Sequence, residues 1–75
     1  MEVIAGQRYR HYKNAKTYVI LAIGRDELTE EKVVIYQAEY DDPEFGNKAV
    51  WVRSYKVFTE TVLHEGKNVS RFLLL

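Results

Sequence analysis

The sequence predicts an all-β fold, a small SH3-like barrel of about five strands with one short helical turn before the last strand. Residues 33–40 and 49–53 are dense in β-branched and aromatic side chains, which favour strands. Four turn-forming residues lie between these two runs: Asp42, Pro43, Gly46 and Asn47. The one segment with a helical signal, residues 54–58, comes late, whereas an OB-fold barrel would place its helix after the third strand.

Length and composition limit the classes of protein to consider. The 75 residues are too few for a second core, so we expect one SH3-like β-barrel domain spanning residues 1–75. The absence of cysteine excludes disulfides and cysteine-ligated zinc, and it suits a cytoplasmic protein. The longest apolar run, residues 18–23, is far shorter than the roughly 20 residues that cross a bilayer. We expect no signal peptide, no membrane partner and no cofactor.

The first predicted strand covers residues 7–12. Arg8 and Arg10 fall on one side of it, and Tyr9 and His11 fall on the other. This alternation with a period of two predicts one solvated face and one face turned toward the core.

The second predicted strand, residues 17–24, is almost wholly apolar. Such a run predicts burial on both faces or a bend across a corner. The acidic segment at residues 25–32 follows as a tip, in which Leu28 is the one residue able to fold back onto the core. The central hairpin of residues 33–40 and 49–53 comes next.

The end of the chain begins with the helical turn at residues 54–58, for which Ser54 is a suitable N-cap. Its aromatic residue Phe58, together with Trp51, is expected in the core. Residues 59–63 predict a short edge strand or an extended connection. After a turn at residues 64–68, one last strand is expected to direct Phe72 and Leu74 toward the core.

Charge is segregated along a chain whose formal net charge is zero. Residues 1–25 and 45–75 carry a basic excess, and residues 26–44 carry an acidic excess. Two interpretations stay open at this point. Two solvated hairpin tips can simply be acidic, or the molecule is dipolar with one cationic face.

The order of residues resembles a bacterial family known as domain of unknown function 1653. The matching positions run along nearly the whole chain: Gly6, Tyr9 to Lys13, Tyr18-Val19, Arg25, Thr29, Glu31, Val33 to Gln37, Tyr40, Trp51 to Arg53, Phe58, Glu60, Val62, Gly66 and Arg71-Phe72. The chain departs from the family pattern at Asn14, Asp26 and Ser54, where glycine, histidine and proline are expected. The resemblance implies a small bacterial cytoplasmic protein and assigns no activity.

Catalytic and metal-binding patterns are weak in this sequence. His11 could act as a base, but a packed strand histidine explains it more simply, and His64 has no ligand partner at metal-binding spacing. The acidic runs lack the spacing of a calcium loop, and no glycine-rich phosphate loop is present. We therefore predict no catalytic residues and no metal site, and an enzyme is the less favoured class.

Aromatic and arginine side chains give the strongest remaining signal. The leading hypothesis is a non-enzymatic binding module that recognises a peptide or another protein through a tyrosine-lined groove. Its predicted site residues are Tyr9, His11, Tyr12, Tyr36, Arg53 and Tyr55. One alternative is a single-stranded nucleic-acid binder that uses Arg8, Arg10, Lys13 and Lys16. A second alternative is a small enzyme with His11 as its base.

Overall fold

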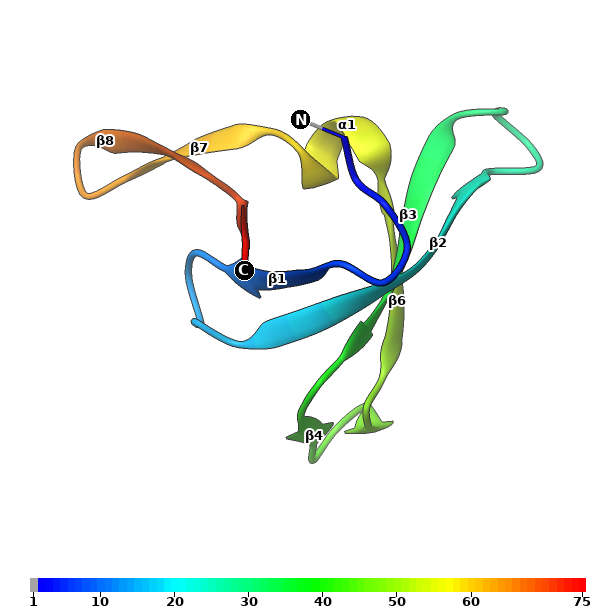
Figure 1. The fold of residues 1–75 in the computed structure, drawn as a ribbon, viewed down its shortest axis with the longest axis horizontal. Helices are drawn as coiled ribbons and strands as arrows, with labels where there is room; N and C mark the ends of the chain where they lie inside the picture. The colour runs from blue at the N-terminus through cyan, green and yellow to red at the C-terminus, as the bar shows by residue number, and fades with distance from the viewer. Residues whose placement is uncertain (1) are drawn as a thin grey trace.

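The computed structural model describes residues 2–75, which form strands and one helical turn (Figure 1). One antiparallel sheet has five strands. Their order across the sheet is β6 (Val50–Ser54), β3 (Lys32–Ala38), β2 (Thr17–Arg25), β1 (Arg8–His11) and β9 (Phe72–Leu74). The prediction of an all-β fold with one short helix is confirmed, although three short strands rather than one follow that helix.

Two small hairpins stand apart from the main sheet. One joins β4 (Asp41–Asp42) to β5 (Gly46–Asn47), and the other joins β7 (Thr61–His64) to β8 (Lys67–Ser70). Figure 1 shows them projecting in different directions from the body of the molecule. Within residues 2–75 no hydrogen-bonded ladder connects β6 to β9, so the sheet is open and the closed barrel that we predicted is not confirmed.

The central hairpin is formed as predicted. Strands β3 and β6 pair in register from Val33 opposite Ser54 to Gln37 opposite Val50. The small β4–β5 hairpin occupies most of the connection between them. The pairing alternates side chains of both strands between the two faces of the sheet, and this places Tyr36 directly beside Trp51.

Strand β2 bends rather than being buried on both faces. Its register with β3 shifts between Ile20 and Ala22, which is the signature of a β-bulge. Ile20 is buried whereas the extra residue, Leu21, is exposed. Of the two outcomes that the apolar run predicted, the structure shows the bend.

The acidic tip between β2 and β3 folds onto itself. The Oδ1 atom of Asp26 accepts the amides of Leu28 and Thr29 at 2.9 and 3.0 Å. The amide of Asp26 donates to the carbonyl of Glu31 at 2.8 Å. Because these local bonds close the loop beyond the sheet, Leu28 stays 91% exposed. Leu28, the one residue of the tip that was able to fold back onto the core, does not do so.

The core is a cluster of aromatic rings on one face of the sheet. The rings of Phe58 and Phe72 are stacked, with centroids 4.0 Å apart and planes 6° apart. Tyr9 meets Phe58 edge to face at 5.3 Å. All three side chains are fully buried together with Ile20 and Val34. Because Phe58 comes from the helical turn, Phe72 from β9 and Tyr9 from β1, these contacts hold three separate segments together.

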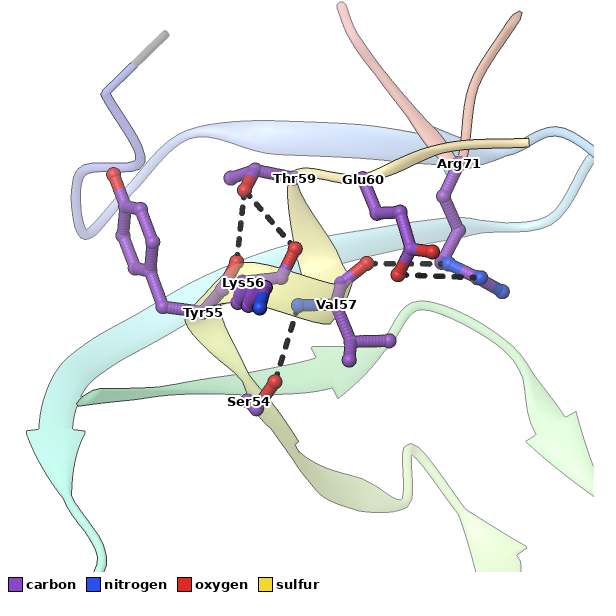
Figure 2. A network of polar contacts seen from close by, with 7 residues as sticks. All are labelled: Ser54, Tyr55, Lys56, Val57, Thr59, Glu60 and Arg71. Carbon is purple, nitrogen blue, oxygen red and sulfur yellow. Dashed lines mark hydrogen bonds and ion pairs between the residues drawn. The ribbon is translucent and has the colours of Figure 1, made fainter. Parts of the chain in front are cut away.

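The helix α1 (Tyr55–Phe58) is held by polar contacts at both ends (Figure 2). The predicted N-cap is confirmed, since Ser54 Oγ accepts the amide of Val57 at 3.1 Å. At the other end, Arg71 Nε donates to the carbonyl of Val57 at 3.2 Å. Arg71 also pairs with Glu60 at 3.9 Å. These contacts attach the helix to the segment that leads into β9.

The end of the chain forms two strands where one was predicted. Arg71 lies in a bend between β8 and β9, and its amide donates to the carbonyl of Glu60 at 3.1 Å. Phe72 is buried as expected. Leu74 remains 45% exposed because β9 is the edge strand, so it contributes less to the core than predicted.

Candidate functional site

A pocket of about 190 Å³ opens on the face of the sheet that carries the core. It receives side chains from β1, β2, β3, β6 and β9 and from the turn after β1. The lining residues are His11, Asn14, Tyr18, Tyr36, Tyr40, Trp51, Arg53 and Phe72. Five of the eight are aromatic residues other than histidine, and none is acidic. The pocket is therefore an aromatic site with positive charge.

Strand β6 shows how the sheet directs side chains into the pocket. Trp51 and Arg53 are two residues apart, so they lie on the same face, and both line the pocket. Val50 and Val52 alternate with them and are exposed on the other face. Trp51 is only partly buried and meets Phe45 edge to face at 5.1 Å. The prediction of core burial is thus confirmed for Phe58, whereas Trp51 forms part of the pocket wall.

Two tyrosines of the pocket share a hydrogen bond. The hydroxyls of Tyr18 and Tyr40 are 2.8 Å apart, and their rings meet edge to face. Burial, followed by the contact with Tyr18, raises the pKa of Tyr40 to about 12. A tyrosine hydroxyl both donates and accepts, so one of the two donates to the other and the second hydrogen remains available.

The raised pKa predicts a loss of stability at alkaline pH. The ordinary tyrosine pKa in an unfolded chain is about 10. Between about pH 10 and the folded-state pKa of about 12, the folded protein binds more protons at Tyr40 than the unfolded chain does. Stability should therefore fall as pH rises through this window. Urea unfolding measured between about pH 10 and 12 should show that the free energy of unfolding falls less steeply with pH for Tyr40→Phe than for the wild-type protein. An equally steep fall in the two proteins would contradict the role of Tyr40.

Arg53 is the one full positive charge in the pocket wall. Its guanidinium carbon lies 5.7 Å from the centre of the Phe72 ring. Burial raises the pKa of Tyr36, and Arg53 is near enough to oppose that rise. Among residues 2–75 the ion pairs join Arg8 to Glu39 and Arg71 to Glu60, so no carboxylate of the described chain neutralises Arg53.

His11 contributes a neutral ring to the pocket. Its Nδ1 accepts the amide of Lys13 at 3.2 Å, which places the proton of the neutral ring on Nε2. Burial lowers the pKa of His11, and the positive charges of Arg53, Arg71 and Lys13 lower it further. At neutral pH the ring is therefore uncharged, and its Nε2 is a hydrogen-bond donor.

Three of the six predicted binding residues come together in this pocket, namely His11, Tyr36 and Arg53. The other three lie elsewhere. Tyr9 is fully buried in the core, with its hydroxyl donating to Gln7 Oε1 at 3.0 Å. Tyr12 packs between His11 and His64. Tyr55 is the first residue of α1, and its hydroxyl accepts the amide of Val3 at 3.0 Å.

Sequence reasoning did not name five residues of the pocket as site residues. They are Asn14, Tyr18, Tyr40, Trp51 and Phe72. A signal for one of them, Trp51, is present in the pattern, because the pairing of β3 with β6 sets it opposite the predicted residue Tyr36 on one face. Tyr40 and Asn14 lie outside the strands, and their positions depend on how the loops close.

The four cationic side chains predicted to contact nucleic acid differ in whether they already contact a neighbouring side chain. The guanidinium of Arg8 contacts both carboxylate oxygens of Glu39 at 2.9–3.0 Å. The ammonium of Lys16 lies 4.2 Å from the centre of the Tyr40 ring. Arg10 and Lys13 are exposed. Two of the four are thus already engaged by neighbouring side chains.

Residues 2–75 contain neither a cluster of metal-binding side chains nor a helix that could span a membrane. Among residues 2–75, no three acidic or histidine side chains lie together in a geometry that could hold a metal ion. No helix in that described part of the chain is long and apolar enough to cross a membrane.

Comparison with known proteins agrees with the resemblance stated above. Residues 7–74 match the model of the family described as "Protein of unknown function (DUF1653)". A crystal structure of a DUF1653 protein from Bordetella bronchiseptica is similar to this chain, with 28% sequence identity and a TM-score of 0.82. The match covers 99% of this chain and 88% of that chain. No curated protein sequence matches significantly.

Proposed function

The chain belongs to the DUF1653 family, and we propose that it is a non-enzymatic binding module whose tyrosine-lined pocket recognises a peptide or protein partner. We include in the proposal a bacterial, cytoplasmic setting, supported by the bacterial source of the similar structure and by the absence of cysteine. The order of the strands, with α1 before the last ones, supports relating the open sheet to SH3-like barrels.

The observation that carries this proposal is the composition of the pocket wall. Ligand sites are concave, mostly apolar and equipped with a few converging polar groups. Here Tyr40 and Trp51 supply partly exposed aromatic surface over the buried rings of Tyr18, Tyr36 and Phe72. The tyrosine hydroxyls, His11 and Arg53 supply the polar groups. Tyrosine, tryptophan and arginine are also the residues enriched at binding hot spots.

Binding is favoured over catalysis by the surroundings of His11. A histidine base is oriented by a carboxylate in the common catalytic arrangements. Here the Nδ1 of His11 is occupied by the backbone amide of Lys13, and no acidic residue lines the pocket. The ring is held as a donor rather than as an oriented base.

An array of random short peptides with free C-termini provides the test. Peptides that bind the wild-type protein would be synthesised, and their affinities measured by fluorescence anisotropy. Trp51→Ala should weaken binding by about tenfold or more, as expected for a central aromatic contact. Val52→Ala is the matched control, because Val52 is the next residue on β6 but lies 64% exposed on the opposite face. It should leave the affinity unchanged.

Two results would contradict the proposal. The first is an array on which no peptide binds. The second is a set of bound peptides whose affinity Trp51→Ala leaves intact. Binding of a single-stranded DNA homopolymer that weakens steeply with salt and depends on Arg10 and Lys13 would instead support the nucleic-acid alternative.

A further inference from the structure

We infer that the pocket holds a carboxylate group of the partner, with the guanidinium of Arg53 as its anchor and His11 Nε2 as a second donor. This inference rests on the proposed function, because it names the chemical group through which the peptide partner is recognised. The group that we expect in the pocket is a carboxylate beside an apolar part of the partner. Its source is either the C-terminus of the partner or an acidic side chain.

The state of Arg53 is the first argument. A partly buried guanidinium loses hydration, and arginine in such places is usually matched by a carboxylate or phosphate. The ion pairs of the described residues leave Arg53 without a carboxylate. Its contact with the Phe72 ring fixes the guanidinium in the pocket wall without neutralising its charge. The pocket therefore presents several directed donors with no anion of its own.

The electrostatic field around His11 is the second argument. Its pKa is lowered by burial and then by three nearby cations, Arg53, Arg71 and Lys13. No carboxylate is among the charges that act on His11, whereas the charge of Asp42 acts on Tyr40. The Nε2 proton of the neutral ring and the spare hydroxyl hydrogen of the Tyr18–Tyr40 pair add donors. An acceptor-only group, such as a carboxylate, suits this arrangement.

A cationic ligand is the main rival, because tyrosine and tryptophan walls also form aromatic cages for ammonium groups. Two observations argue against it. Cations of the chain already lie against two of the pocket rings, Lys16 against Tyr40 and Arg53 against Phe72. A second cation in the pocket would also stand beside Arg53 with no acidic lining residue to offset the repulsion.

Charge balance favours a carboxylate over a phosphate. Phosphate groups carry nearly two negative charges at neutral pH and are typically bound by clusters of arginines. Arg53 is the single full cation among the lining residues. Arg71 lies near, but it is engaged by Glu60 and by the carbonyl of Val57. One guanidinium matches one carboxylate in both charge and planar geometry.

Small aromatic probes test the inference on the whole protein. Benzoate, benzamide and benzyltrimethylammonium share one ring and differ in charge. We expect benzoate to shift the NMR signals of the Arg53 Nε–H and the Trp51 indole N–H, and benzamide and the ammonium to bind at least about tenfold more weakly. Arg53→Gln should reduce benzoate affinity by about tenfold or more, whereas Arg10→Gln, at an exposed site on β1, should not. Equal binding of benzamide, stronger binding of the ammonium, or no benzoate binding would overturn the inference.

Synthetic peptides separate the two sources of the carboxylate. Each peptide from the array would be compared with its C-terminal amide and with its glutamate-to-glutamine and aspartate-to-asparagine forms. Loss of binding on amidation assigns the C-terminus, and loss on side-chain neutralisation assigns an acidic residue. If the neutral forms bind as well as the originals and still need Trp51, the carboxylate inference fails while the proposed function stands. If benzoate binds through Arg53 but no peptide binds, the proposed function fails and the carboxylate site stands.

Discussion

Phe58→Ala is expected to destabilise the protein by about 3–5 kcal/mol, the usual cost of deleting a buried phenylalanine. Phe58 is fully buried, stacks on Phe72 and meets Tyr9 and Tyr36 edge to face. The loss would leave a cavity where α1, β1 and β9 meet. The free energy of unfolding of protein domains is about 5–15 kcal/mol, and small domains lie at the low end of this range. A loss of this size should therefore leave much of the protein unfolded at room temperature.

Urea unfolding followed by circular dichroism measures this effect. Leu28→Ala is the matched control, because it also removes a large apolar side chain, but one that is 91% exposed at the acidic tip. It should change the free energy of unfolding by less than about 0.5 kcal/mol. Equal effects of the two substitutions would contradict the assignment of the aromatic core.

Tyr9→Ala is expected to have a similar cost, about 3–5 kcal/mol, because the ring is fully buried. The sequence suggested Tyr9 as a ligand contact, whereas in the structure the ring supports the core through Phe58. The substitution should therefore unfold the protein instead of weakening binding selectively. Thermal unfolding measures the first effect, and NMR titration of the remaining folded protein with benzoate measures the second.

Tyr9→Phe separates the ring from the hydroxyl. It removes only the hydrogen bond to Gln7, whose loss should cost about 0.5–1.5 kcal/mol. The protein should stay folded and keep its affinity for pocket ligands. A folded Tyr9→Phe protein that no longer binds pocket ligands would show that the Tyr9 hydroxyl contacts the ligand, which would contradict its position in the core.

The parts of the fold that the sequence predicted are those set by local patterns. The alternation around Tyr9 predicted which face of β1 is buried, and Ser54 marked the start of α1. The turn residues between the runs at 33–40 and 49–53 predicted the central hairpin. Periodicity and capping depend on neighbours in the chain, and a single sequence displays them directly.

The parts that it missed depend on contacts between distant segments. Whether the sheet closes into a barrel depends on the distance between its two edge strands, β6 and β9. No local sequence pattern determines that distance. The bend at Arg71 that divides the last strand is formed together with Glu60 and the end of α1. Leu28 was the one residue of the acidic tip able to reach the core, but the loop closed by Asp26 keeps it in solvent.

The candidate site was predictable to the same extent. His11, Tyr36 and Arg53 were named because aromatic rings beside histidine and arginine are typical of binding surfaces, and they meet in one pocket. Choosing which tyrosines line it required the three-dimensional packing. Tyr9, Tyr18 and Tyr36 all belong to strands and are all buried, yet only Tyr18 and Tyr36 line the pocket.

The most direct test of the account is chemical-shift mapping of the isotope-labelled protein with a peptide selected on the array. We predict that the largest changes occur at Trp51, Arg53, Tyr36 and His11, with the Arg53 Nε–H signal among the most shifted. Changes centred on Val50 and Val52, on the opposite face of the same strand, or on the exposed Arg10 of β1 would contradict this prediction, because the ligand would then bind outside the pocket.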